Sequence, residues 1–171
     1  MKRLENLPAA VMAAALSFHL FAGLSFIFSS APTFDEPVHL AAGYSYLVSG
    51  RNMMDLTGHP PFSEAMSALP LLGMKLYSLA GHPYLMDGRM VRYADLFLYD
   101  NTAGAQRIIT AARVFTFLVW TALAALFLFL FARALAGPGA GAAAVAVFCA
   151  MPAFISNDAL VTTDAGAAIF F

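Results

Sequence analysis

The chain has 171 residues, of which 61% are hydrophobic and 11% are charged, and its formal net charge is −1. Soluble domains are about half apolar and about one quarter charged, so this composition excludes an ordinary soluble domain and indicates a membrane protein. A nearly neutral chain also lacks the basic excess of nucleic-acid-binding proteins. Cys149 is the only cysteine, which excludes an intramolecular disulfide and a cysteine-based zinc site.

The first apolar segment, residues 7–28, carries no charge and is long enough to cross a bilayer as a helix. Lys2 and Arg3 precede it, which predicts a cytoplasmic N-terminus. The alternative is a signal peptide cleaved at the small residues 29–31, but the apolar stretch exceeds the usual core of about 7–15 residues. His19 lies in mid-span and is either a functional group or, as expected for a lone neutral imidazole, an interhelical hydrogen-bonder.

Two more uncharged segments, 114–131 and 140–155, predict a second and a third span. The glycine–proline–glycine sequence at 137–139 predicts the turn between them. A fourth apolar segment begins near residue 165 and is cut off at the end of the sequence. We therefore expect an all-α polytopic membrane protein, in which this chain is the N-terminal part of one transmembrane domain.

The segment between the first two spans, residues 29–112, is too long to be structureless, and the charges of the shorter links predict that it is an external loop. Thr33 and Glu36 have capping-box spacing and predict a helix start. A proline pair at 60–61 predicts a second helix, with a kink at Pro70. Their apolar stripes predict that both helices lie along the membrane surface. The stripes are Leu40, Tyr44 and Leu47 in the first helix, and Phe62, Met66 and Leu69 in the second.

Acidic residues gather at the ends of the predicted spans. Asp35 and Glu36 follow the first span, and a cluster over 157–164 ends in Asp164. Two crossings separate these links, so their carboxylates are expected on the same, outer side of the membrane. Carboxylates there suit general-base chemistry or cation binding, and the alternative is that they cap helices. His59 adds a titratable imidazole, for which the alternative is an ordinary solvated loop histidine.

Several motifs in order resemble the first external loop and following spans of GT-C membrane glycosyltransferases. They are most similar to the dolichyl-phosphate-mannose protein mannosyltransferases and the bacterial aminoarabinose lipid A transferases. The resemblance covers nearly all of this chain and the N-terminal part of a family member. The matching segments are Pro-Thr-Phe-Asp-Glu-Pro-Val-His-Leu-Ala-Ala-Gly-Tyr at 32–44, His-Pro-Pro at 59–61, Ala-Arg at 112–113, Gly137, and Thr-Thr-Asp at 162–164.

The resemblance implies an inverting sugar transfer from a polyprenyl-phosphate donor on the outer side of the membrane. Asp35 would be the base that deprotonates the acceptor hydroxyl, supported by Glu36. Asp164 would orient the acceptor or hold a cation. Arg113 would pair with the donor phosphate, unless it is a plain interfacial anchor. His59 matches a motif position without an assigned role.

The resemblance also implies a multi-pass protein of the bacterial inner membrane, whose partners are the donor, membrane lipids and an acceptor lipid, glycan or protein. No cofactor follows from the motifs, although a divalent metal is compatible with the acidic residues. The alternative is a non-catalytic polytopic membrane protein, either a transporter component or a polyprenyl-lipid binder. A transporter should place its charges near the midplane of the bilayer. Here the acidic residues lie at span ends, which favours interfacial chemistry.

Overall fold

The computed structural model describes residues 7–51, 54, 61–77 and 90–170, and within these ranges every regular element is helical. His59 therefore lies outside the described residues. The elements are α2 (Leu7–Ser29), α3 (Glu36–Ser49), α4 (Pro61–Ala68), the 3₁₀ helix η1 (Leu69–Gly73), α6 (Met90–Tyr99), α7 (Ala105–Ala136), α8 (Pro138–Ala150), α9 (Pro152–Asp158) and α10 (Asp164–Phe170).

Two of the described helices, α2 and α7, are long and apolar enough to cross a membrane, so the chain is a membrane protein. Helix α2 is the predicted first span. Helix α7 contains the predicted second span, 114–131, and begins before it. Its 32 residues extend about 48 Å, against a bilayer core of about 30 Å, so one or both ends of α7 project beyond the hydrocarbon.

The third predicted span is broken. A single helix over 140–155 was expected, but α8 ends at Ala150 and α9 continues at an angle of 71° to it. The cause is Pro152, which cannot donate a backbone hydrogen bond and which favours extended geometry at Met151. Met151 has φ −83° and ψ 116° accordingly. The 13 residues of α8 extend about 20 Å, too short to cross alone.

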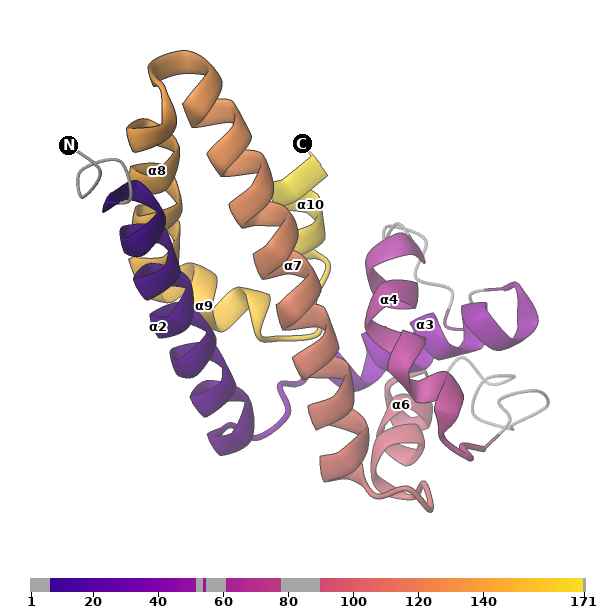
Figure 1. Cartoon of the computed structure of the whole chain (residues 1–171). Helices are drawn as coiled ribbons and strands as arrows, with labels where there is room; N and C mark the ends of the chain where they lie inside the picture. Colours follow the sequence, from indigo (N-terminus) through magenta and orange to yellow (C-terminus); the bar gives the residue numbers. More distant parts are fainter. Residues whose placement is uncertain (1–6, 52–53, 55–60, 78–89, 171) are drawn as a thin grey trace.

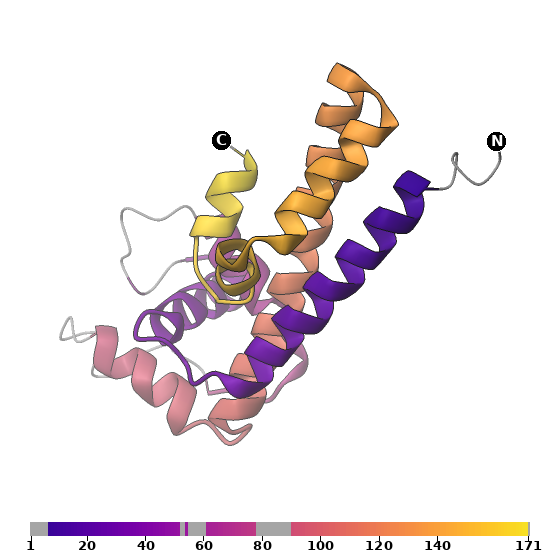
Figure 2. The same cartoon turned by 90° about the vertical axis from the view of Figure 1, so that its left-hand side faces the viewer.

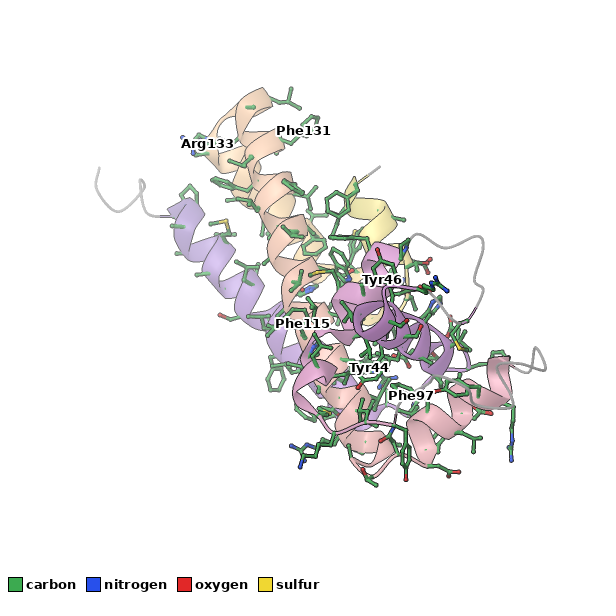
Figure 3. All side chains as sticks on the ribbon, turned by 90° about the vertical axis from the view of Figure 1, so that its right-hand side faces the viewer. Tyr44, Tyr46, Phe97, Phe115, Phe131 and Arg133 are labelled. Carbon is green, nitrogen blue, oxygen red and sulfur yellow. The ribbon has the colours of Figure 1, made fainter. Side chains whose placement is uncertain are left out.

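Helices α3, α4 and α6 gather at one end of α2 and α7, away from the link between α7 and α8 (Figures 1 and 2). Helix α3 is the centre of this group and contacts both α4 and α6. The rings of Tyr44 and Phe97 lie with their centroids 5.5 Å apart (Figure 3). Helix α3 ends at Ser49, because Gly50 takes the left-handed conformation with φ 71° and donates its N–H to the backbone oxygen of Tyr46.

The apolar stripe that predicted a membrane-surface position for α3 faces other helices instead. Leu40 and Tyr44 of its apolar stripe are buried against other helices of the chain, so that stripe does not face lipid. In α4 the arrangement is reversed, because Phe62 is exposed while Ser63 and Glu64 are buried. An exposed apolar face on α4 is what a surface-lying helix requires, and for α4 the expectation stays a prediction.

The remainder of the loop also differs from the predicted outline. The second loop helix ends at Gly73, and the predicted kink at Pro70 is a change from α-helix to 3₁₀ helix. Helix α6 was not predicted. The loop ends at Gly104 rather than at residue 112, because α7 begins two turns before its uncharged stretch.

His19 joins three helices inside the membrane segment. Its Nδ1 lies 3.3 Å from the backbone oxygen of Cys149 in α8, and its Nε2 lies 3.3 Å from Oγ1 of Thr121 in α7. A carbonyl oxygen can only accept, so Nδ1 carries the hydrogen and Nε2 accepts from the hydroxyl, as in neutral imidazole. The ring is stacked between Phe117 and Phe148. The interhelical role expected for His19 is confirmed.

Close packing of α3 on α4 depends on Gly43. A Cβ added at this position would overlap the backbone carbonyl of Glu64, and backbone cannot move aside as a flexible side chain can. Gly43→Ala is therefore expected to destabilise the protein by about 1–3 kcal/mol, as overpacking does, although alanine favours helices by up to about 1 kcal/mol. Thermal unfolding in detergent measures this. Gly139→Ala is the control, since its Cβ would meet open space, and equal melting of both variants would contradict the packing argument.

Candidate functional site

A buried ion pair links the start of α3 to α7. The Nε atom of Arg113 donates to Oε1 of Glu36 at 2.8 Å, and its Nη2 donates to Oε2 at 2.6 Å. Both side chains are fully buried. The same guanidinium donates to the backbone oxygens of Ser30 and Ala31, at 2.9 Å each. Arg113 therefore fastens both the end of α2 and the beginning of α3.

The carboxylate of Glu36 has three further donors. The backbone N–H of Val161 donates to Oε1 at 2.9 Å, and the backbone N–H of Thr33 donates to Oε2 at 2.7 Å. The single hydroxyl hydrogen of Thr33 is shared between Oε2 of Glu36 at 3.0 Å and Oδ1 of Asp35 at 2.8 Å. Val161 lies in the link between α9 and α10, so Glu36 brings this link to the loop after α2. The two acidic segments predicted to meet are thus held against each other, by Glu36 itself.

Such a buried pair is stable only when its remaining hydrogen-bonding positions are filled. Burial alone would raise the pKa of Glu36, but hydrogen bonds from Arg113, Val161 and Thr33, together with the positive charge of Arg113, lower it below its ordinary value of 4.5. Glu36 is therefore ionised at neutral pH. These donors keep Glu36 negatively charged although it is buried. Glu36 and its donors Arg113, Thr33 and Val161 form the hub of the site.

The lowered pKa of Glu36 predicts a loss of stability in acid. A carboxylate whose pKa is lower in the folded than in the unfolded protein stabilises the fold above the unfolded value, and this stabilisation declines as the pH falls through the folded value. The melting temperature of the wild type should therefore exceed that of Glu36→Gln at about pH 7, and the difference should shrink below about pH 4.5. A difference that stays constant into acid would show that the Glu36 charge is not linked to folding.

Asp35 precedes this hub and is left outside it. It occupies the N-cap position of α3, yet its side chain makes no capping hydrogen bond. Its carboxylate is exposed and accepts a hydrogen bond from Oγ1 of Thr33 at 2.8 Å. Phe34 beside it is 81% exposed. Helix capping, the alternative role for Asp35, is thus not seen, and the carboxylate is oriented but open to an incoming group.

The other predicted site residues differ in their exposure to solvent. Asp164 is exposed and is the first residue of α10, at the end of the link that Glu36 holds. Arg113 is neither an exposed anchor nor open to a phosphate, because Glu36 and two backbone oxygens occupy it. The contact between Arg113 and the donor phosphate stays a prediction, and it requires Arg113 to leave Glu36. His59 is not placed, because it lies outside the described residues.

Two buried acidic groups were not singled out from the sequence. Oε1 of Glu64 in α4 lies 3.0 Å from Nδ1 of His39 in α3, and both side chains are buried. Asp158 at the end of α9 is 3% exposed, and among the residues that the structure describes its Oδ2 has no hydrogen-bond partner. The only available signal was that Glu64 and Asp158 each lie among apolar residues with no basic residue nearby in sequence. Such carboxylates need a partner from elsewhere.

A protein metal site needs several nitrogen, sulfur or oxygen ligands grouped together. Within those ranges no three His, Cys, Asp or Glu residues are grouped so that they could hold a metal ion. The hub itself does not suit a cation, because both oxygens of Glu36 are taken by donors. Comparison with protein-family models, with curated proteins and with solved structures finds no match.

Proposed function

We propose that this protein is an inverting glycosyltransferase that moves a sugar from a polyprenyl-phosphate donor to an acceptor hydroxyl on the outer side of the membrane in which it lies. The observation that carries the proposal is the contrast between two adjacent carboxylates. Glu36 is buried and fully hydrogen-bonded, whereas Asp35 is exposed, uncapped and oriented by Thr33. A rigid backbone that presents one free carboxylate is what a general base needs.

In the proposed reaction, Asp35 takes the proton of the acceptor hydroxyl as that oxygen attacks the anomeric carbon of the sugar. The bond from this carbon to the phosphate oxygen breaks, and its electron pair leaves with the polyprenyl phosphate. Attack opposite the leaving group inverts the anomeric configuration. Glu36 and Arg113 are positioning residues that hold the loop, and Asp164 orients the acceptor from the start of α10.

The non-catalytic alternative, a polyprenyl-lipid binder, uses the same buried hub and leaves Asp35 without a chemical role. The two functions differ in the product. With a polyprenyl-phosphate sugar and a lipid or sugar acceptor, the reconstituted protein should release polyprenyl phosphate and form a glycoside of inverted configuration, which NMR of the product detects. Saturable donor binding without release of polyprenyl phosphate would favour the binder, and a product of retained configuration would exclude a single displacement.

The proposed orientation places the group formed by α3, α4 and α6 outside and the turn between α7 and α8 inside, in a bacterial inner membrane. It rests on Lys2 and Arg3 before α2 and on Arg133 near the far end of α7 (Figure 3). In a Cys149→Ser background, an impermeant thiol reagent added to intact cells should label Thr102→Cys but not Ala136→Cys. Both positions are exposed and lie near opposite ends of α7. Labelling of Ala136→Cys alone would reverse the orientation.

A further inference from the structure

A cavity of about 670 Å³ lies between α7, the α8–α9 pair and α10. This is within the range of about 300–1,000 Å³ that is usual for ligand pockets. Most of its lining is apolar and comes from all three sides. The apolar lining residues are Ala124, Phe127, Leu128, Phe131, Phe148, Phe154, Ala165, Ala168 and Ile169.

The polar lining residues are all in the chain between the end of α9 and the start of α10, and two of the three are acidic. They are Asn157, Asp158 and Asp164. Asp158 is 3% exposed and its Oδ2 has no hydrogen-bond partner among the described residues. Buried carboxylates elsewhere in the described chain have partners, as Glu36 and Glu64 do. An unpartnered buried carboxyl oxygen is costly, so a positive charge at this end of the cavity would stabilise the Asp158 side chain.

Charge decides which group fits. None of the described residues that line the cavity is basic, so an anionic head group would meet carboxylates without a compensating cation. An ammonium group carries three donors and one positive charge, which complements the acidic side chains of Asp158 and Asp164 in the lining. The apolar walls suit an alkyl tail.

We propose that this cavity binds a lipid amine, a single-chain amphiphile whose tail lies between α7 and α10 and whose ammonium group pairs with Asp158 and Asp164. This site shares Asp164 with the proposed acceptor site, and it differs from the Asp35 site in its other residues and in its charge preference. It excludes a phosphate head group and therefore differs from the donor site of the proposed transfer reaction. Binding of the amine does not depend on that reaction.

Trp120 is the only tryptophan and makes the binding measurable. It lies on α7 one turn before Ala124 of the cavity wall, a rise of about 6 Å. A long-chain alkylamine with a terminal bromine should quench its fluorescence saturably in phosphatidylcholine nanodiscs. The fatty acid of equal length, brominated at the same carbon, should bind at least about tenfold more weakly, since a hydrogen bond to a charged group contributes about 1.5–3 kcal/mol.

Two variants separate head-group from tail recognition. Asp158→Asn keeps the shape and should weaken amine binding by about tenfold or more, whereas Asp100→Asn, an exposed carboxylate in the link after α6, should change nothing. Ala168→Phe should fill the cavity and block the tail, with a melting curve to confirm folding. Equal quenching by amine and fatty acid, or unchanged amine binding in Asp158→Asn, would overturn the proposal. So would disulfide-linked dimers of Ala168→Cys that the amine does not suppress, since a second copy would then occupy the cavity.

Discussion

Arg113→Met is expected to destabilise the protein by about 3–5 kcal/mol, because it leaves the carboxylate of Glu36 buried without its cation. Methionine is close to arginine in length and is apolar, so the packing of α7 is largely kept. The change also removes the donors to Ser30 and Ala31. The loop after α2 would therefore lose both its ion pair and its backbone anchors.

Chemical unfolding in detergent, monitored by the fluorescence of Trp120, measures this loss. Arg107→Met is the matched control, because Arg107 is exposed on the first turn of the same helix and surface changes are usually within about 0.5 kcal/mol. Arg113→Lys should lie between the two, since lysine keeps the charge but lacks the planar fork. If Arg113→Met unfolds like Arg107→Met, the pair with Glu36 does not hold the loop.

The membrane spans could be predicted from the sequence because their signal is local. An uncharged segment of about 20 residues usually forms a membrane-spanning helix. Helix α2 and the centre of α7 match the two segments of this kind. The break at Met151 also has a signal in the sequence, because Pro152 lies inside an apolar segment. The hydropathy of residues 140–155 does not register this proline and indicates one continuous span. Helix α3 was placed on the membrane because its apolar stripe cannot by itself distinguish lipid from a neighbouring helix such as α6.

The hub of the candidate site could be predicted only in part. Glu36 and Arg113 were both named, yet they lie 77 positions apart in sequence, and no periodicity reports that they meet. Arg113 at the edge of an apolar run has the same pattern as an anchor that reaches to the interface. Asp158 was passed over in favour of Asp164 because burial is decided by the fold of α9, which the sequence did not define.

Asp35→Asn is expected to reduce sugar transfer by about 10²–10⁴, the usual effect of losing a general base. The amide oxygen of asparagine can still accept the hydrogen bond from the hydroxyl of Thr33. Asparagine is also about as good at the N-cap as aspartate. Stability and donor binding should therefore stay near those of the wild type. Glu36→Gln should instead lower the melting temperature and the activity together, because it weakens the contacts that hold the loop.

In the proposed mechanism, the exposed carboxylate of Asp35 acts as the base, while the buried carboxylate of Glu36 holds the loop. The measurement is the turnover number with a polyprenyl-phosphate sugar, taken beside a melting curve for the wild type, Asp35→Asn and Glu36→Gln. Asp35→Asn is expected to melt at the same temperature as the wild type and to turn over about 10²–10⁴ times more slowly. Wild-type turnover in Asp35→Asn, or a loss of activity that only follows a lowered melting temperature, would contradict this mechanism.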